Sequence, residues 1–157
     1  MSNSTAALIV VPTYNEADNL VPLVTQICAQ PCDFDILVVD DNSPDGTGEI
    51  ADQLKAERSN IHVVHRVGKL GLGTAYVAGF RWAIERDYDY VFEMDCDFSH
   101  HPRYLPTFLE KVEDADLVIG SRYVKGGGKG KWGAMRKMIS WGGNAFARKM
   151  LSLKTQD

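Results

Sequence analysis

Cysteine is scarce in this chain of 157 residues, which has only Cys28, Cys32 and Cys96. An odd number of cysteines cannot pair completely, and the spacing does not match the paired ligands of zinc sites. A small domain held together by disulfides is therefore excluded. We expect all three thiols to be reduced, as is usual for proteins of the cytosol.

Long apolar runs and internal repeats are also missing. No stretch reaches the roughly 18 apolar residues of a membrane-spanning helix, and no signal-peptide pattern precedes the first apolar segment. We therefore expect a cytoplasmic location. A length of 157 residues is enough for one domain with a sizeable core.

Basic residues are few over most of the chain. Residues 1–121 contain 8 Lys and Arg against 20 Asp and Glu, whereas residues 122–157 contain 9 against 1. The acidic part is suited to holding a cation and the basic part to meeting an anion. We therefore distinguish a core of residues 1–121 from a basic, glycine-rich segment of residues 122–157, and we expect no nucleic-acid partner.

Short apolar segments followed by polar or turn-forming residues are typical of strands buried on both faces. They occupy residues 6–11, 34–39, 61–65 and 90–94, and we expect a fifth strand at residues 116–120. Segments with helical spacing alternate with them, at about residues 16–31, 48–58, 75–86 and 104–112. This alternation predicts an α/β fold with a mostly parallel sheet flanked by helices.

Polar residues follow three of the predicted strands. They are Tyr14 and Glu16 after the first, Asp40 and Asp41 after the second, and Asp95 and Asp97 after the fourth. Open parallel sheets bind ligands beyond the carboxyl ends of their strands. Polar clusters from three strands at one edge therefore predict a ligand site there.

Asp95 and Asp97 are the strongest candidates for chemistry. Residues i and i+2 of an extended strand point to the same side, so the two carboxylates are expected to face one spot. Like charges that close repel unless a cation lies between them. Mg²⁺ or Mn²⁺ with a substrate diphosphate fits such a pair, and two solvated aspartates in a turn are the alternative interpretation.

Three motifs resemble the inverting family 2 glycosyltransferases. They are Val-Val-Pro-Thr-Tyr-Asn-Glu at residues 10–16, Val-Val-Asp-Asp-Asn-Ser-Pro-Asp-Gly-Thr at 38–47 and Met-Asp-Cys-Asp-Phe-Ser-His at 94–100. Within this family the chain most resembles the dolichyl- or polyprenyl-phosphate mannose synthases, as do Gly-Leu-Gly-Thr-Ala at 71–75 and Gly-Ser-Arg-Tyr at 120–123. The resemblance implies the GT-A fold, a Rossmann-like nucleotide-sugar domain. It also implies a metal-dependent hexosyltransferase that moves mannose from GDP-mannose to a polyprenyl or dolichyl phosphate.

The resemblance also assigns residues to the donor site. Nucleotide-sugar contacts fall to Pro12, Tyr14, Glu16, Val39 and Asp41, the last two near the base and ribose. Asp95 and Asp97 would hold Mg²⁺ or Mn²⁺, with the Cys96 backbone near the diphosphate. Ser99 lies where some members have a glutamine as a third metal ligand, and Arg122 matches an arginine near the donor and acceptor phosphates. Asp97 and Arg122 are thus the expected catalytic residues.

The basic segment is expected to serve the lipid acceptor. Lys125, Lys129 and Lys131 suit a phosphate or membrane headgroups, and residues 132–153 have the pattern of an amphipathic helix. We therefore expect a peripheral location at the cytosolic face of a membrane. Members of the family continue with a further acceptor-side segment, so the chain is expected to be incomplete.

Other functions remain open at this point. A UDP-glucose-dependent polyprenyl-phosphate glucosyltransferase is the first alternative. A nucleotidyltransferase should have a glycine-rich, basic loop after the first strand, where this chain has Pro-Thr-Tyr-Asn-Glu at 12–16. A dinucleotide oxidoreductase needs Gly-x-Gly-x-x-Gly there, and this chain has only Gly71-x-Gly73 after the third strand. A non-catalytic nucleotide-binding module is the last alternative.

Overall fold

The computed structural model describes residues 6–121, 135, 138, 140–143, 146 and 150. The chain divides into two compact units, Met1–Leu109 and Glu110–Asp157. The elements follow in the order β1 (Ala7–Thr13), α1 (Ala17–Cys28), β2 (Asp35–Asp40), α2 (Thr47–Glu57), β3 (Ile61–His65), α3 (Leu72–Ile84), β4 (Tyr90–Glu93), the 3₁₀ helix η1 (Pro102–Tyr104) and α4 (Leu105–Val112). The predicted boundary at residue 121 stays a prediction.

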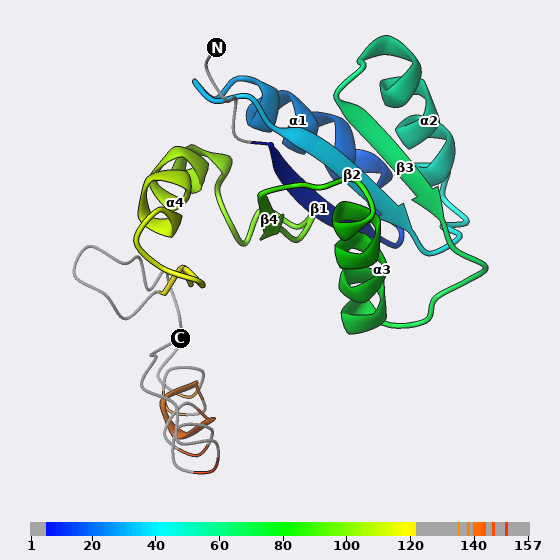
Figure 1. Cartoon of the computed structure of the whole chain (residues 1–157). Helices are drawn as coiled ribbons and strands as arrows, with labels where there is room; N and C mark the ends of the chain where they lie inside the picture. Colours follow the sequence, from blue (N-terminus) through cyan, green and yellow to red (C-terminus); the bar gives the residue numbers. More distant parts are fainter. Residues whose placement is uncertain are drawn as a thin grey trace, which may run out of the picture. The chain divides into compact units, whose positions relative to one another are not determined.

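A parallel four-stranded sheet forms the centre of the first unit, with the strand order β3-β2-β1-β4. The chain runs outward from β1 to β2 and β3 and then returns to place β4 on the other side of β1 (Figure 1). The strand order therefore reverses at β1. In open α/β sheets, such a reversal leaves a crevice at the carboxyl ends of the strands on either side of it, here β1 and β4, and ligands bind in this crevice.

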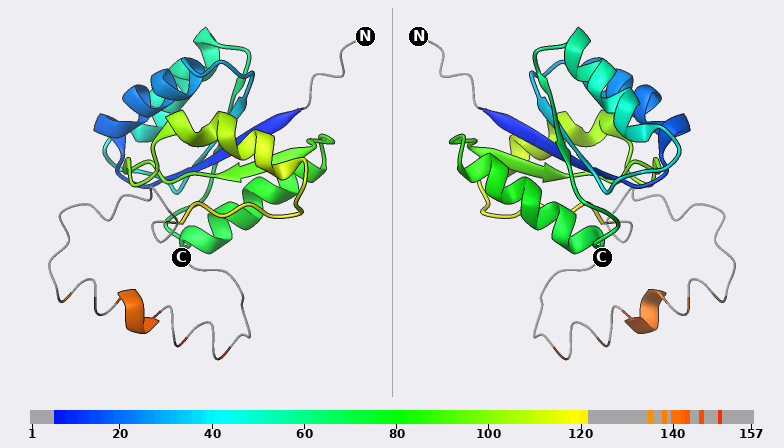
Figure 2. Two further views of the ribbon diagram at one scale, coloured as in Figure 1. Left: turned by 90° about the vertical axis from the view of Figure 1, so that its left-hand side faces the viewer. Right: turned by 90° about the vertical axis from the view of Figure 1, so that its right-hand side faces the viewer.

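Both faces of the sheet are covered by helices, with α1 and α2 on one face and α3 on the other (Figures 1 and 2). Alternate residues of β1 point to opposite faces of the sheet. Ile9 and Val11 belong to the core under α1 and α2, whereas Leu8 and Val10 belong to the core under α3. All four side chains are fully buried. This explains why β1 is an unbroken apolar run instead of an alternating one.

Helix α3 lies very close to the sheet because its buried face carries only small residues, Ala75, Gly79 and Ala83. A Cβ atom added at Gly79 would lie 2.4 Å from Cγ1 and 2.8 Å from Cγ2 of Val10. No larger residue fits at this contact without movement of the helix or the strand. The helix begins at Leu72, just after the loop that leaves β3, so its first turns lie at the carboxyl edge of the sheet.

The four strands and the helices between them confirm the fold predicted from the sequence, but the fifth strand is wrong. Residues 116–120 are not in a strand. A strand needs a neighbour with which to exchange backbone hydrogen bonds, and in the described part of the chain this segment pairs with no strand of the sheet, while Leu117 and Ile119 are exposed.

The segment predicted as a helix at 132–153 is described only in part. The described residues within it (135, 138, 140–143, 146 and 150) are helical. Within the residues that the structure places, no helix combines the length and the apolar character that crossing a bilayer requires.

Candidate functional site

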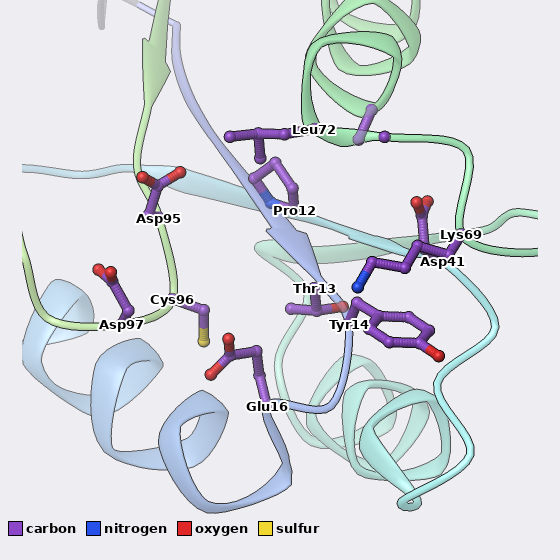
Figure 3. Close-up of a pocket in the computed structure, with 12 residues that line it drawn as sticks. Pro12, Thr13, Tyr14, Glu16, Asp41, Lys69, Leu72, Asp95, Cys96 and Asp97 are labelled. Atoms are coloured by element: carbon purple, nitrogen blue, oxygen red, sulfur yellow. The ribbon is translucent and has the colours of Figure 1, made fainter.

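A pocket of about 240 Å³ lies at the carboxyl ends of β1 and β4 (Figure 3). The residues that line it come from the end of β1, the end of β2, the start of α3 and the loops beside them. They are Pro12, Thr13, Tyr14, Glu16, Asp41, Lys69, Gly71, Leu72, Ala75, Asp95, Cys96 and Asp97. Most site residues predicted from the sequence are therefore brought together in one pocket.

The turn that carries Tyr14 and Glu16 is held by side chains that follow β2. Asn15 adopts a left-handed backbone conformation with φ 61°, and its N–H donates to Oγ of Ser43. The N–H of Glu16 donates to Oγ1 of Thr47 at 2.9 Å. The motif at residues 38–47 thus holds the turn after β1, which carries Tyr14 and Glu16 into the pocket.

Asp40 is a bracing residue and does not line the pocket. Its side chain is 2% exposed. Its Oδ1 accepts hydrogen bonds from Oγ1 of Thr13 and Oγ of Ser43, and its Oδ2 accepts one from the N–H of Ser43. A buried carboxylate with three donors is fully satisfied, so Asp40 fixes the end of β1 against the end of β2.

Asp41 lines the pocket and also holds the loop before α3. Its Oδ1 lies 3.0 Å from Nη1 of Arg66, where the two atoms meet as an ion pair without hydrogen-bond geometry. Its Oδ2 accepts the N–H of Leu70 at 3.0 Å, and Nη2 of Arg66 donates to Oγ1 of Thr74 at 2.6 Å. The side chains of Arg66 and Asp41 are only 10% and 7% exposed. Arg66 is not among the site residues predicted from the sequence.

Lys69 is a second pocket residue that was not predicted from the sequence. It is the only basic side chain among those lining the pocket in the described part of the chain. Its Nζ lies 4.1 Å from the centroid of the Tyr14 ring, a cation–π contact that holds both side chains. Lys69 follows β3 as Tyr14 follows β1, at the same edge of the parallel sheet, and this edge position could have indicated it.

Asp95 and Asp97 both line the pocket, as the i, i+2 rule predicts. β4 ends at Glu93, but the alternation continues beyond it, because Met94 and Cys96 are buried at 5% and 3% exposure. Figure 3 shows the two carboxylates on one side of the pocket and Tyr14, Asp41 and Lys69 on the other. The pocket therefore has two chemically different ends.

The two carboxylates have different partners. The hydroxyl of Tyr76 donates to Oδ1 of Asp95 at 2.7 Å. Both oxygens of Asp97 accept from Ser99, Oδ1 from its N–H and Oδ2 from its Oγ, each at 2.8 Å. Partial burial raises the pKa of Asp97, but the hydrogen bonds from Ser99 and the neighbouring His100 outweigh it, so the pKa lies below its usual value. Asp97 is therefore ionised at neutral pH.

Burial has the opposite effect on the neighbouring groups. Burial, with a smaller effect of Asp95, raises the pKa of Glu93. Burial and the hydrogen bond to Asp95 raise the pKa of Tyr76, so its hydroxyl remains a donor. Burial, together with the charges of Glu16 and Asp97, raises the pKa of Cys96 to about 12. The Cys96 thiol is therefore neutral and unsuited to act as a nucleophile or as a thiolate ligand.

The donor set fits a hard divalent cation held jointly with a substrate. Asp95 and Asp97 offer carboxylate oxygens, and the described residues contain no group of three or more His, Cys, Asp and Glu side chains that could hold a metal ion without a substrate. Mg²⁺ is commonly bound by one or two carboxylates, with substrate phosphates and water completing its coordination. Two carboxylates at the end of a pocket match that arrangement.

Of the remaining predicted site residues, Val39 and Ser99 are described and do not line the pocket. Val39 is fully buried in β2 and does not line the pocket. Ser99 contacts Asp97, and its role as a metal ligand stays a prediction. Arg122, Lys125, Lys129 and Lys131 lie outside the described residues, so their predicted roles at the acceptor and the membrane also stay predictions.

Two curated relatives match almost the whole chain. The chain is 52% identical over 150 residues to the undecaprenyl-phosphate mannosyltransferase of Micrococcus luteus, covering 96% of this chain and 62% of that protein. It is 46% identical over 153 residues to the polyprenol monophosphomannose synthase of Mycolicibacterium smegmatis, covering 96% of this chain and 57% of that protein. The chain therefore spans about three fifths of the length of these relatives.

A solved structure supports the fold. S. aureus TarS 1-349 aligns with 69% of this chain and 32% of its own length, with a TM-score of 0.59 and 22% sequence identity. The resemblance seen in the three motifs is confirmed by a match to the family described as glycosyl transferase family 2 over residues 8–156. This chain thus belongs to glycosyl transferase family 2.

Proposed function

We propose that this chain is the donor-binding part of an enzyme that transfers mannose from GDP-mannose to a polyprenyl phosphate. The observation that carries the proposal is the pair Asp95 and Asp97 in a pocket at the point where the strand order reverses. The names of the two relatives, a mannosyltransferase and a monophosphomannose synthase, support the sugar and the lipid acceptor.

The two ends of the pocket have different duties in this proposal. Asp95 and Asp97 would hold Mg²⁺ or Mn²⁺, and such an ion, when bound, stabilises the charge of a diphosphate leaving group. Tyr14, Asp41 and Lys69 at the other end would hold the nucleoside. Four carboxylates (Glu16, Asp41, Asp95 and Asp97) line the pocket against one lysine. Without a cation, this excess of negative charge would repel the diphosphate.

The lipid phosphate acceptor needs no strong base from the protein. It is already an anion, so the protein has to position it and neutralise its charge. Arg122 and the lysines of the basic segment would supply positive charge for this purpose. The predicted third ligand Ser99 is not required, because substrate oxygens and water can complete the coordination.

The membrane surface is a second part of the proposal. Residues 122–157 carry 9 Lys and Arg against 1 Asp and Glu, and such segments bind anionic headgroups. The chain should therefore bind anionic liposomes and be released at about 0.5 M salt, because salt screens these attractions. Equal binding at low and high salt, or none at either, would contradict an electrostatic attachment at the cytosolic face of a membrane.

Calorimetry tests the donor and the metal together. GDP-mannose should bind more tightly than UDP-glucose, the alternative donor, and its affinity should fall when EDTA replaces Mn²⁺. The variant D97N should lose the metal-dependent part, whereas D33N, at an exposed residue outside the pocket, should retain it. Equal affinity in EDTA and in Mn²⁺ would overturn the metal site, and tighter binding of UDP-glucose would identify a glucosyltransferase instead.

A further inference from the structure

Tyr76 contacts the candidate metal site although it does not line the pocket. It lies in α3, and its hydroxyl donates a hydrogen bond of 2.7 Å to Oδ1 of Asp95, which lies beyond β4. Its ring packs against the core beneath α3 and stacks on Phe80, with 6.4 Å between the ring centroids and 25° between the planes. The ring is therefore supported, and the hydroxyl reaches out of the core to the carboxylate.

The position of Tyr76 is fixed by the close packing of α3. Ala75 precedes it and is 1% exposed, and Gly79, three residues later, allows the helix to approach Val10. Val10 pairs in register with Glu93, the last residue of β4. The contact between α3 and β1 therefore determines how far the Tyr76 hydroxyl reaches toward the segment that follows β4.

Asp95 and Asp97 differ in how many of their carboxylate oxygens accept hydrogen bonds from the described part of the protein. Ser99 donates to both oxygens of Asp97. Tyr76 donates to Oδ1 of Asp95, and no group in the described part of the chain donates to its Oδ2. Hydrogen bonds to a ligating carboxylate orient it, and the loss of such an outer contact typically lowers metal affinity about 10-fold to 100-fold. Asp95 is thus held by one oxygen and offers the other.

We infer that Tyr76 is a positioning residue of the metal–diphosphate site, which holds Asp95 by Oδ1 and leaves Oδ2 as the oxygen that binds the cation. This inference rests on the proposed function, because it assumes that Asp95 and Asp97 hold a cation with a nucleotide diphosphate. Without the hydroxyl, Asp95 is free to turn away from Asp97, whose like charge repels it. Tyr76 therefore offsets a repulsion that the site contains before any cation binds.

Tyr88 provides a matched control. Its hydroxyl also donates to a carboxylate, Oδ2 of Asp35, and its ring also stacks on an aromatic residue, Trp82, with 5.8 Å between centroids. Neither Tyr88 nor Asp35 lines the pocket. The variants Y76F and Y88F therefore remove the same kind of hydrogen bond, one beside Asp95 and one away from it.

The experiment compares the whole chain with Y76F and Y88F. Urea unfolding first checks that both variants fold. Calorimetry then measures GDP affinity in Mn²⁺ and in EDTA, and electron paramagnetic resonance measures Mn²⁺ bound in the presence of GDP. We expect Y76F to weaken the Mn²⁺-dependent affinity by about 10-fold to 100-fold, the range for outer-contact substitutions at metal sites. Its GDP affinity in EDTA should not change, and Y88F should bind as the parent chain does.

A double variant separates positioning from a general structural role. If Tyr76 acts through Asp95, adding Y76F to D95N should cause no further loss, because the group that it positions is already altered. Equal Mn²⁺-dependent affinity of Y76F and the parent chain would overturn the inference alone, as would an equal loss in EDTA. Binding by the parent chain that ignores Mn²⁺ would overturn the proposed metal site and this inference with it.

Discussion

The contact between Gly79 and Val10 leads to a sharp prediction for the variant G79A. The added methyl group would lie 2.4 Å from Cγ1 of Val10, whereas ordinary contacts begin at 3.4 Å. The shortfall is therefore 1.0 Å. Val10 is fully buried in a central strand, and a valine side chain has little rotamer freedom. The methyl group can be accommodated only if α3 or β1 moves.

The expected loss of stability follows from two opposing effects. Overpacking of a well-packed core usually costs about 1–3 kcal/mol. Replacing a glycine in a helix by alanine contributes about 0.5–1 kcal/mol in the other direction. We therefore expect G79A to lower the free energy of unfolding by about 1–2 kcal/mol. Movement of α3 should also displace Tyr76, so the Mn²⁺-dependent affinity for GDP should fall in the same variant.

Gly73 is the control within the same helix. A Cβ atom added there would meet no atom within 4 Å, so G73A should keep or raise the free energy of unfolding by up to about 1 kcal/mol. Urea unfolding followed by circular dichroism measures both variants. The double variant V10A/G79A should be less damaged than the sum of the single variants, because removing the valine methyl groups makes room. If G79A proves as stable as G73A, the close packing of α3 is refuted.

Three further predictions concern single residues. R66M should lower the free energy of unfolding by about 3 kcal/mol, because it leaves the buried carboxylate of Asp41 without its ion pair. R86M removes an exposed ion pair and should lower it by less than about 1 kcal/mol. Similar urea midpoints for the two variants would contradict this difference. A hydrogen bond from the Thr47 side chain holds the pKa of Asp45 below its usual value of 3.8. The contribution of the Asp45 carboxylate to the free energy of unfolding is therefore present above that pH and is lost as the pH falls through the lowered pKa. D45N should therefore be less stable than the parent chain at pH 7, and a stability difference that persists unchanged below pH 3 would oppose this reasoning. Burial raises the pKa of Cys96 to about 12. At pH 8 its thiol should therefore react with a disulfide reagent much more slowly in the folded chain than in urea. Equal reaction rates would count against the burial of this thiol.

Much of the fold was predictable because local signals and tertiary structure agree. The strands β1 and β2 are apolar runs buried on both faces, and turn-forming residues mark their ends. Asp95 and Asp97 were predictable for the same reason, since the alternation of an extended chain brings them to one side. Residues 116–120 show the limit of such signals, because an apolar run becomes a strand only where a partner is available.

The contacts that complete the site could not be predicted from local patterns. Arg66 and Tyr76 are 25 and 19 residues from the carboxylates that they contact. In the sequence, Arg66 follows a strand and Tyr76 lies within a helical pattern, so neither differs from an ordinary surface or core residue. The Arg66 contact depends on how the segments after β2 and β3 meet in space. The Tyr76 contact depends on how closely α3 approaches the sheet, which Gly79 permits.

The adjacent residues Asp40 and Asp41 have a consequence for the thermodynamics of ligand binding. Asp40 secures Thr13 and Ser43, and Asp41 secures Arg66 and the backbone of Leu70. The turn after β1 and the loop before α3, which lie at the same end of the pocket, are thereby attached to consecutive residues at the end of β2. Loops that are ordered on binding reduce affinity through their lost conformational entropy. Here much of that entropy is lost when the chain folds. A ligand at the end of the pocket formed by Tyr14, Asp41 and Lys69 should therefore bind with a small entropic penalty, and replacing Asp40 or Asp41 should lower its affinity chiefly through entropy.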